Sequence, residues 1–374
     1  MKILYICTFY HRALLFRQQM DALNELGHDI YAFNTAQYGD GIADKFIPIM
    51  DSRVKHFECW NKFDRIFFFP RQWKIEKKLE KEYSISEFDL IHSHLLLSSG
   101  STALKMKKKY KIPYVVSVRV TDLKGFIKIP GFRYLANKII TESNGVIFLS
   151  NVHKRELLNK YIYKKNIENV ENKSKVIGNC IEKYWEQNIN ITPKHIDNES
   201  PLKILSVAKI RPKKNLTVAA KTVSILNEMG IKATLTIVGE NQDNEEMKKL
   251  KQYKNVELLP FANKTELLRL YRSHDVFLLP SLEETFGRVY VEAMTQGLPV
   301  IYTKNQGFDG NFEDGVVGYA IDSQNPQEIA NRVIDIVNNY DVIQQNCVRL
   351  CSNFFEGEII NKLDIFYKES LKRG

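Results

Sequence analysis

The stretch PSLEETFGRVYVEAMTQGLPVI, residues 280–301, joins a predicted strand to a predicted helix through a short loop. The apolar run VFLLP at 276–280 predicts a buried strand, and RVYVEAMTQG at 288–297 predicts a helix that ends in a glycine. The loop therefore leads into a helix N-terminus, where free amides and the positive dipole end favour a phosphate. Glu284 lies in the loop and Glu292 lies in the helix, so two carboxylates can hold different parts of one extended ligand.

A purely structural interpretation of the same loop is also open. Ser281 and Glu284 match the Ser-x-x-Glu capping box, in which case Glu292 is an ordinary surface residue. Gly287 favours the functional interpretation, because a glycine at the helix entry lets a ligand approach the backbone closely. The choice depends on the rest of the chain.

The chain is long enough for two domains, since its 374 residues exceed the roughly 100–200 typical of one. Apolar, β-branched runs alternate with amphipathic helical patterns on both sides of a polar stretch at 188–201, which suits a linker. This alternation predicts an α/β protein with mostly parallel sheets covered by helices on both faces, and ligands bind such sheets at the carboxyl ends of the strands. The predicted strands lie at 2–7, 29–34, 90–94, 114–119, 145–150, 175–179, 203–209, 233–239, 256–260, 276–280 and 299–303.

The net charge of +10 comes from the first half of the chain alone. Residues 1–190 carry 31 Lys and Arg against 20 Asp and Glu, and the run KMKKKYK at 105–111 is the densest part. Two interpretations stay open for this charge: a solvated helix face, or attraction to an anionic surface such as phospholipid headgroups or a lipid-linked phosphate. Nucleic acid is disfavoured as a partner, because no recognised binding motif accompanies the charge.

A second unusual stretch, FDRIFFFPRQWKIEKKLEKEY at 63–83, is both aromatic and basic. It fits a packed loop followed by an exposed helix, and it also fits a contact with a membrane surface. We favour the packed loop.

The composition excludes an integral membrane protein. No apolar run approaches the roughly 18–20 residues of a spanning helix, so we predict neither a transmembrane helix nor a signal peptide. The five cysteines are scattered without paired spacing, which predicts a reducing, cytoplasmic location. His92 and His94 alternate onto one face of a strand end, but no third ligand is evident and we predict no metal site.

With this context, the chain resembles glycosyltransferase family 4, the retaining group with the GT-B fold of two facing Rossmann-like domains and an interdomain cleft. The resemblance rests first on Glu284 and Glu292, seven residues apart, with Phe286-Gly287 between them. EAMTQGLPVI follows where the family has Glu-Ala-Met-Ala-x-Gly-x-Pro-Val. It extends through ILSVAKIRPKKN (204–215), LTIVGE (235–240), VELLPFANKTELLRLYRSHDVFLLPS (256–281) and EDGVVGYAI (313–321), and more loosely through LIHSHL (90–95) and VIGNCI (176–181).

The resemblance implies a domain division and a donor site. It implies an N-terminal acceptor-binding domain over 1–190, a C-terminal nucleotide-sugar-binding domain over 200–345, and terminal helices over 346–374 that pack back towards the N-terminal domain. Glu292 matches the glutamate that accepts hydrogen bonds from the donor ribose, and Glu284 matches the catalytic glutamate near the donor sugar. The other implied donor-binding residues are Lys209, Arg211, Lys214, Gly239, Phe286, Gly287, Arg288 and Val289.

Two departures from the family pattern concern the charged residues. Lys209 stands where the family has an arginine, and lysine lacks the bidentate fork, so Arg211 is a candidate to share the task. Arg119 stands where many members have a histidine; it cannot act as a base, but it can stabilise phosphate charge, and we treat it as the second catalytic candidate. The acceptor-side candidates are Arg12, His94 and Asp122.

The implied reaction moves a sugar from a nucleoside-diphosphate donor to an acceptor hydroxyl with retention, without a metal ion or other cofactor and without a protein nucleophile. The basic first half suggests a polyprenyl-diphosphate-linked saccharide as acceptor and work at the inner face of the cytoplasmic membrane, in capsule, exopolysaccharide or O-antigen assembly. The alternatives are a GT-B nucleotide-sugar epimerase, a phosphorylase and a basic binding module without activity. An NAD-dependent oxidoreductase is disfavoured because neither half opens with GxGxxG.

Overall fold

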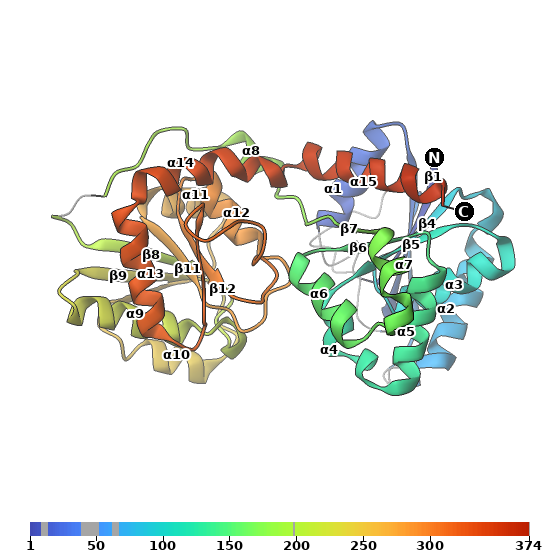
Figure 1. The fold of residues 1–374 in the computed structure, drawn as a ribbon, viewed down its shortest axis with the longest axis horizontal. Coiled ribbons are helices and arrows are strands. Elements are labelled where there is room, and N and C mark those ends of the chain that lie inside the picture. The colour runs from blue at the N-terminus through green and yellow to red at the C-terminus, as the bar shows by residue number, and fades with distance from the viewer. Residues whose placement is uncertain (9–13, 39–51, 62–66, 197–198, 374) are drawn as a thin grey trace. The chain divides into compact units, whose positions relative to one another are not determined.

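The computed structural model describes residues 1–8, 14–38, 52–61, 67–196 and 199–373 (Figure 1). The chain divides into two compact units, each with its own hydrophobic core. The first unit comprises residues 1–149, 153–178 and 356–374, and the second comprises residues 150–152 and 179–355.

The first unit is built on a parallel sheet whose described strands run in the order β3-β2-β1-β4-β5-β6-β7. The strand order reverses between β1 and β4, which makes the carboxyl ends of these two strands the natural ligand position. The strands are β1 (Lys2–Cys7), β2 (Asp29–Gln37), β3 (Val54–Trp60), β4 (Leu90–Ser93), β5 (Tyr114–Val118), β6 (Gly145–Phe148) and β7 (Ser174–Val176).

Helices follow most strands of this unit, as the alternating sequence pattern predicts. Gly27, with φ +83°, ends the first of them in the left-handed conformation that glycine adopts without strain. The described helices are α1 (Leu14–Glu25), α2 (Phe68–Glu82), η3 (Ile85–Glu87), α3 (Ser98–Tyr110), α4 (Val120–Lys124), η4 (Phe126–Lys128), α5 (Pro130–Glu142), α6 (Asn151–Lys160), η5 (Lys164–Asn166), α7 (Ile167–Asn172) and α15 (Glu356–Leu371).

The second unit repeats the design, with parallel strands in the order β10-β9-β8-β11-β12-β13 and the reversal between β8 and β11. Its strands are β8 (Leu202–Val207), β9 (Ala233–Val238), β10 (Val256–Leu259), β11 (Val276–Leu279), β12 (Val300–Thr303) and β13 (Gly318–Ile321). Its helices are α8 (Lys183–Gln187), η6 (Pro212–Lys214), α9 (Leu216–Glu228), α10 (Asn244–Leu250), α11 (Lys264–Ser273), α12 (Arg288–Thr295), α13 (Pro326–Asn338), α14 (Tyr340–Leu350) and η7 (Cys351–Phe354).

The division between the units differs from the predicted one at two places. The main boundary between the units lies between Gly178 and Asn179 rather than near residue 190, because Ile181 and Trp185 are buried in the second core. Of the terminal helices, α14 and η7 stay with the second unit, and α15 alone packs on the first, alongside α1 (Figure 1).

All eleven predicted strands are present, and the described residues contain two further strands that were not predicted. One is β3, whose residues are mostly half-buried at the sheet edge and so lack a clean apolar alternation. The other is β13, four residues long, where Gly318 lies so close to β12 that a Cβ would be 1.8 Å from the carbonyl oxygen of Val300.

Candidate active site

The loop after β11 leads directly into α12. Gly287 is the residue before the helix and has φ +81°, a left-handed conformation, and a Cβ at this position would lie 2.5 Å from the ring of Tyr290. The helix begins at Arg288, so Ser281 is not its N-cap and the capping-box interpretation of Ser281 and Glu284 is wrong. The amides at the start of α12 carry no side-chain cap.

Glu284 forms an ion pair with Lys214. The Lys214 Nζ lies 2.7 Å from the Glu284 Oε2, and each side chain is only 14% exposed. Lys214 ends η6 after β8, and Glu284 follows β11, so the pair sits beyond two adjacent strands at the point where the strand order reverses. The sheet therefore places a cation and a carboxylate where an open α/β sheet binds its ligand.

The loop after β12 forms hydrogen bonds with the backbone of Glu284. The Glu284 amide donates to the Oε1 of Gln306 at 3.0 Å, and the Gly307 amide donates to the Glu284 carbonyl at 3.0 Å. Gly307 approaches so closely that a Cβ would lie 2.0 Å from the carbonyl oxygen of Thr285.

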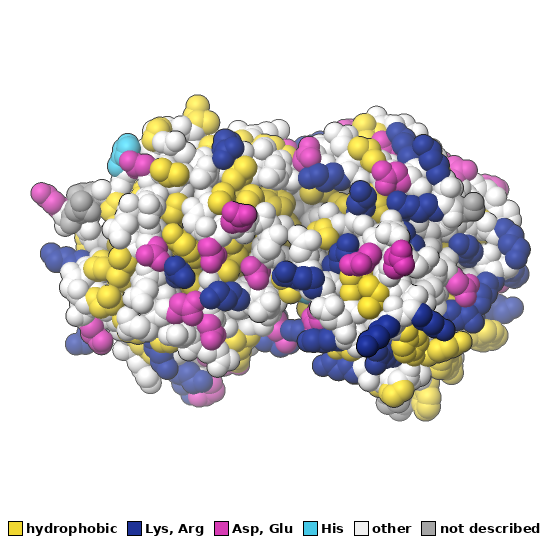
Figure 2. All heavy atoms as spheres, viewed as in Figure 1, with side chains coloured by type: hydrophobic (Ala, Val, Ile, Leu, Met, Phe, Trp, Pro, Cys, Tyr) yellow, Lys and Arg dark blue, Asp and Glu magenta, His cyan; other side chains and the backbone are white. Residues whose placement is uncertain are grey.

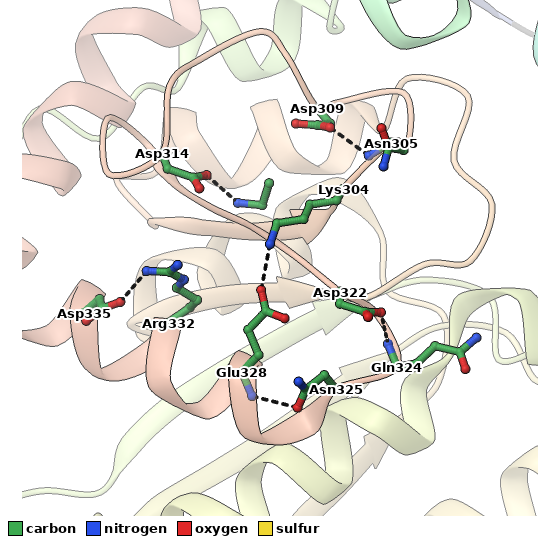
Figure 3. Close-up of polar contacts among 11 residues, drawn as sticks. Lys304, Asn305, Asp309, Asp314, Asp322, Gln324, Asn325, Glu328, Arg332 and Asp335 are labelled. Carbon is green, nitrogen blue, oxygen red and sulfur yellow. Dashed lines mark hydrogen bonds and ion pairs between the residues drawn. The ribbon is translucent and has the colours of Figure 1, made fainter. Parts of the chain in front are cut away.

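This supporting loop is itself anchored at its base (Figure 3). Lys304 pairs with Glu328 of α13 at 2.8 Å, and the amide of Asn305 donates to the Asp309 carboxylate at 2.7 Å. Glu284 is thus positioned by hydrogen bonds to its backbone on one side and by the lysine on the other.

Arg288 and Glu292 lie one turn apart on α12. Burial raises the pKa of Glu292 to about 7, with Glu182 adding to the rise, while Arg288 and a 3.4 Å hydrogen bond from the Tyr271 hydroxyl oppose it. The Nη1 of Arg288 is buried and has no hydrogen-bond partner among the residues that the structure describes. A buried guanidinium nitrogen without an acceptor is suited to bind an anionic group.

The other donor-site candidates divide into backbone and surface positions. Phe286 is buried against Phe354, with the ring centroids 5.5 Å apart, and Val289 is half-buried. At Gly239 packing alone requires a glycine, because a Cβ at this position would lie 1.9 Å from the carbonyl oxygen of Ala208.

Lys209 and Arg211 are exposed on the segment between β8 and η6. Lys209 pairs with Glu240 at 3.2 Å rather than with a residue of the α12 loop. Its role and that of Arg211 in donor binding stay predictions.

In the first unit, three of the four candidate residues gather beyond β4 and β5. The Arg119 Nε donates to the carbonyl oxygen of His94 at 3.0 Å, and its guanidinium lies 5.1 Å from the ring centre of Phe16. Asp122 accepts from the amides of Arg119 and Leu96, and burial raises its pKa to about 6. The fourth candidate, Arg12, lies outside the described residues.

His94 is buried, and neither ring nitrogen has a partner in the described part of the chain. Burial, followed by the charges of His92 and Arg119, holds its pKa well below the usual range, so the imidazole is neutral. Its ring stacks on that of His92 at 3.9 Å.

His92 belongs to a buried hydrogen-bonded chain that reaches the C-terminal helix. Its Nε2 lies 2.8 Å from the Ser117 Oγ, and its Nδ1 lies 2.6 Å from the hydroxyl of Tyr367 on α15. The Tyr367 hydroxyl lies 3.0 Å from that of Tyr5 on β1. Helix α15 therefore helps to hold His92, on which the ring of His94 stacks.

The described residues contain no group of three or more His, Cys, Asp or Glu side chains arranged to hold a metal ion. None of the helices in that same part of the chain is long and apolar enough to cross a bilayer.

Comparison with known proteins agrees with this geometry. Residues 187–349 match the sequence family described as glycosyl transferases group 1, and residues 15–181 match glycosyltransferase family 4. An uncharacterised glycosyltransferase of Methanocaldococcus jannaschii is 25% identical over 83% of this chain and 81% of its own length. The alpha-monoglucosyldiacylglycerol synthase of Acholeplasma laidlawii is 24% identical over 86% of this chain and 83% of its own.

The fold has a close counterpart among solved structures. HepE of Anabaena, determined in complex with UDP-glucose, aligns over 98% of this chain and 99% of its own with a TM-score of 0.69 and 17% identity. The two parallel-sheet, Rossmann-like units thus have the GT-B fold. The chain belongs to the group 1 glycosyltransferases with this fold, and it is a sugar-transferring enzyme.

Three supporting residues had no signal in the sequence. Gln306 orients Glu284, Tyr271 contacts Glu292, and Tyr367 contacts His92. Each reaches its partner from an element distant in the chain, so a single sequence offered no spacing that could reveal them.

Proposed function

We propose that the protein is a retaining, metal-independent glycosyltransferase that moves a hexose from a nucleoside diphosphate to an acceptor hydroxyl. The observation that carries the proposal is the unpartnered, buried Nη1 of Arg288 at the start of α12, one turn from Glu292. Family membership favours sugar transfer over an epimerase, a phosphorylase or a binding module.

The second unit supplies the donor side in this proposal. Lys214, Arg288 and the uncapped amides of α12 neutralise the diphosphate as it leaves, which is the charge that a metal ion would otherwise balance. The carboxylate of Glu292 accepts hydrogen bonds from the donor ribose. Glu284, held by Lys214, faces the donor sugar, with the backbone of 286–289 beside it.

The first unit supplies the acceptor side. Arg119 stabilises negative charge on the donor phosphate or on an anionic acceptor, and His94 offers two unpartnered ring nitrogens to acceptor hydroxyls. No protein side chain is needed as nucleophile, because the acceptor hydroxyl attacks on the face that the diphosphate leaves and passes its proton to the leaving phosphate.

We propose a lipid-linked saccharide, such as a polyprenyl-diphosphate-linked sugar, as the acceptor, used at the inner face of the cytoplasmic membrane. The excess of basic residues in positions 1–190 supports this choice, and so does the Acholeplasma relative, whose name refers to a diacylglycerol lipid. Assembly of a cell-surface polysaccharide such as a capsule, an exopolysaccharide or an O-antigen is the class of pathway that consumes such a product.

The test is transfer by the purified protein in EDTA, with a panel of nucleotide sugars and a lipid-linked saccharide. The proposal expects release of the nucleoside diphosphate without added metal and a product whose anomeric proton shows the donor's configuration. Absolute dependence on a divalent ion, or an inverted anomeric centre, would contradict it.

A further inference from the structure

Two segments of the first unit expose large apolar side chains next to each other. They are the start of α2 and the η4–α5 corner, and the six side chains are between 42% and 67% exposed. We call this set the aromatic face. Its members are Phe67, Phe69, Trp73, Phe126, Ile129 and Tyr134.

Ring contacts join the two segments into one surface. Phe69 stacks on Phe132 with an interplanar angle of 8° and a centroid distance of 6.0 Å, and Phe126 lies 5.1 Å from the same ring. Phe68 is buried, and its ring packs edge-on against that of Phe132 with the centroids 4.9 Å apart. Phe69 and Trp73 are four residues apart on α2 and so lie on the same side of that helix.

Residues 63–66 of the predicted packed loop lie outside the described residues; of those that follow, Phe68 is buried, whereas Phe67, Phe69 and Trp73 are exposed. Such exposure is unusual, because a contiguous apolar surface in water is unfavourable unless a partner covers it. Figure 2 shows hydrophobic side chains gathered beside Lys and Arg side chains at the lower right of the view, in the region where Figure 1 draws α5.

The charge on the η4–α5 side of the aromatic face has one sign, whereas Trp73 on the α2 side lies beside Glu76 and Glu80 as well as lysines. Residues 123–141 contain Lys124, Lys128, Arg133 and Lys138 and no Asp or Glu. By contrast, the lysine run at 105–111 is largely neutralised, since Lys105 pairs with Glu76 and Lys109 with Glu80. The uniformly basic segment is thus the one that carries part of the aromatic face.

We propose that the aromatic face docks on an anionic phospholipid bilayer, with its aromatic side chains at the headgroup level and the surrounding lysines on the phosphates. Aromatic rings favour the membrane–water interface, and basic side chains beside them are attracted to anionic lipids. A bilayer surface accepts this combination without a complementary shape. The purpose of docking rests on the proposed function, because it brings the enzyme to a lipid-linked acceptor.

The test is co-sedimentation of the full-length protein with vesicles of phosphatidylcholine alone and of phosphatidylcholine mixed with phosphatidylglycerol. The wild type is expected to bind the mixed vesicles and to release at high salt. The double variant Phe69→Ser, Trp73→Ser is expected to bind at least about tenfold more weakly, through loss of apolar contact. Phe261→Ser, which replaces an even more exposed aromatic in the second unit, is the matched control and is expected to bind as the wild type does.

Two further variants test the contribution of basic side chains to vesicle binding. Lys128→Glu is expected to weaken binding to the mixed vesicles, and Lys248→Glu, an exposed lysine of the second unit, is expected to leave it unchanged. Circular dichroism confirms that each variant is folded.

Three outcomes would overturn the proposal. These are a wild type that ignores the mixed vesicles, a double variant that still sediments with them, and a face that instead drives self-association, seen as a lower mass for the double variant by light scattering without lipid. Nucleotide binding and transfer to a water-soluble acceptor separate this inference from the proposed function. If both persist while vesicle binding is absent, only the docking proposal fails; if vesicle binding is present and both are absent, only the proposed function fails.

Discussion

At the residue scale, the site depends on how burial acts on a few charges. The negative charge of Glu284 is balanced by its ion pair with Lys214. The charge of Glu292 is balanced less well, because Arg288 only partly offsets the effect of burial. The pKa of Glu292 therefore rises to about 7 from the ordinary value of 4.5. In the ligand-free protein this carboxyl is mostly protonated below neutral pH.

This raised pKa predicts a pH-dependent donor affinity. Ribose hydroxyls donate hydrogen bonds, so they bind the ionised carboxylate better than the neutral acid. Between about pH 6 and pH 8 the ionised fraction of a group with this pKa rises about tenfold, and affinity for the nucleoside diphosphate is expected to rise by up to the same factor.

Isothermal titration calorimetry across this pH range measures the effect. Glu292→Gln keeps the size of the side chain and cannot ionise, so its binding profile is expected to lack this rise. The phosphate groups of the ligand titrate equally with both proteins, and identical pH profiles for wild type and variant would refute the assignment.

At the element scale, the entry to α12 shows what the backbone demands of one position. Gly287 needs a left-handed conformation and also leaves no space for a side chain beside Tyr290. Gly230, in the same unit at the end of α9, has φ +87° but open space around its Cα. Substituting Gly230 therefore introduces backbone strain alone, whereas substituting Gly287 adds a steric conflict to the same strain.

We expect Gly287→Ala to destabilise the protein more than Gly230→Ala. The left-handed conformation alone costs roughly 1–2 kcal/mol for alanine, and only at Gly287 does the contact with the Tyr290 ring add to it. Urea unfolding of the two variants gives the comparison. Equal free energies of unfolding would show that the ring moves aside at no cost.

The elements also show how far the sequence could be interpreted. Strong apolar runs such as β8 and β11 were predictable, and so was the helix that starts at Arg288, because local pattern and burial agree there. The Lys214–Glu284 pair and the Tyr367–His92 contact were not, since each joins residues remote in the chain through the sheet topology. The motif thus indicated the candidate site, and only the structure showed which residues support it.

At the scale of the whole molecule, the chain crosses between two independent cores, and its last helix returns to the first. Tyr367 on that helix gives the Nδ1 of buried His92 its partner. We therefore expect a substitution of Tyr367 to change the stability of the first unit, and a bound nucleotide to change the stability of the second.

Tyr367→Phe is expected to lower the stability of the first unit by about 1–3 kcal/mol, the cost of leaving a buried polar group without its hydrogen bond. An added nucleoside diphosphate is expected to raise the unfolding temperature of the second unit only. Calorimetric melting of both proteins with and without nucleotide measures both shifts, and Tyr134→Phe, at an exposed hydroxyl of the same unit, is the control. A Tyr367→Phe protein that melts like the wild type would show that the buried chain contributes nothing.

We propose that the second unit binds a nucleoside diphosphate through Lys214 and the start of α12. The most direct measurement is calorimetric binding of UDP, GDP, ADP and CMP in EDTA to the wild type, Lys214→Ala and Lys213→Ala. Lys213 is the matched control, because it is the next lysine along and forms its own ion pair with Glu283, 2.7 Å away on the exposed surface. We expect one diphosphate to bind, Lys214→Ala to weaken its binding by roughly 1–3 kcal/mol, and Lys213→Ala to leave its binding unchanged. Binding of none of the four, or equal losses in the two variants, would contradict this proposal.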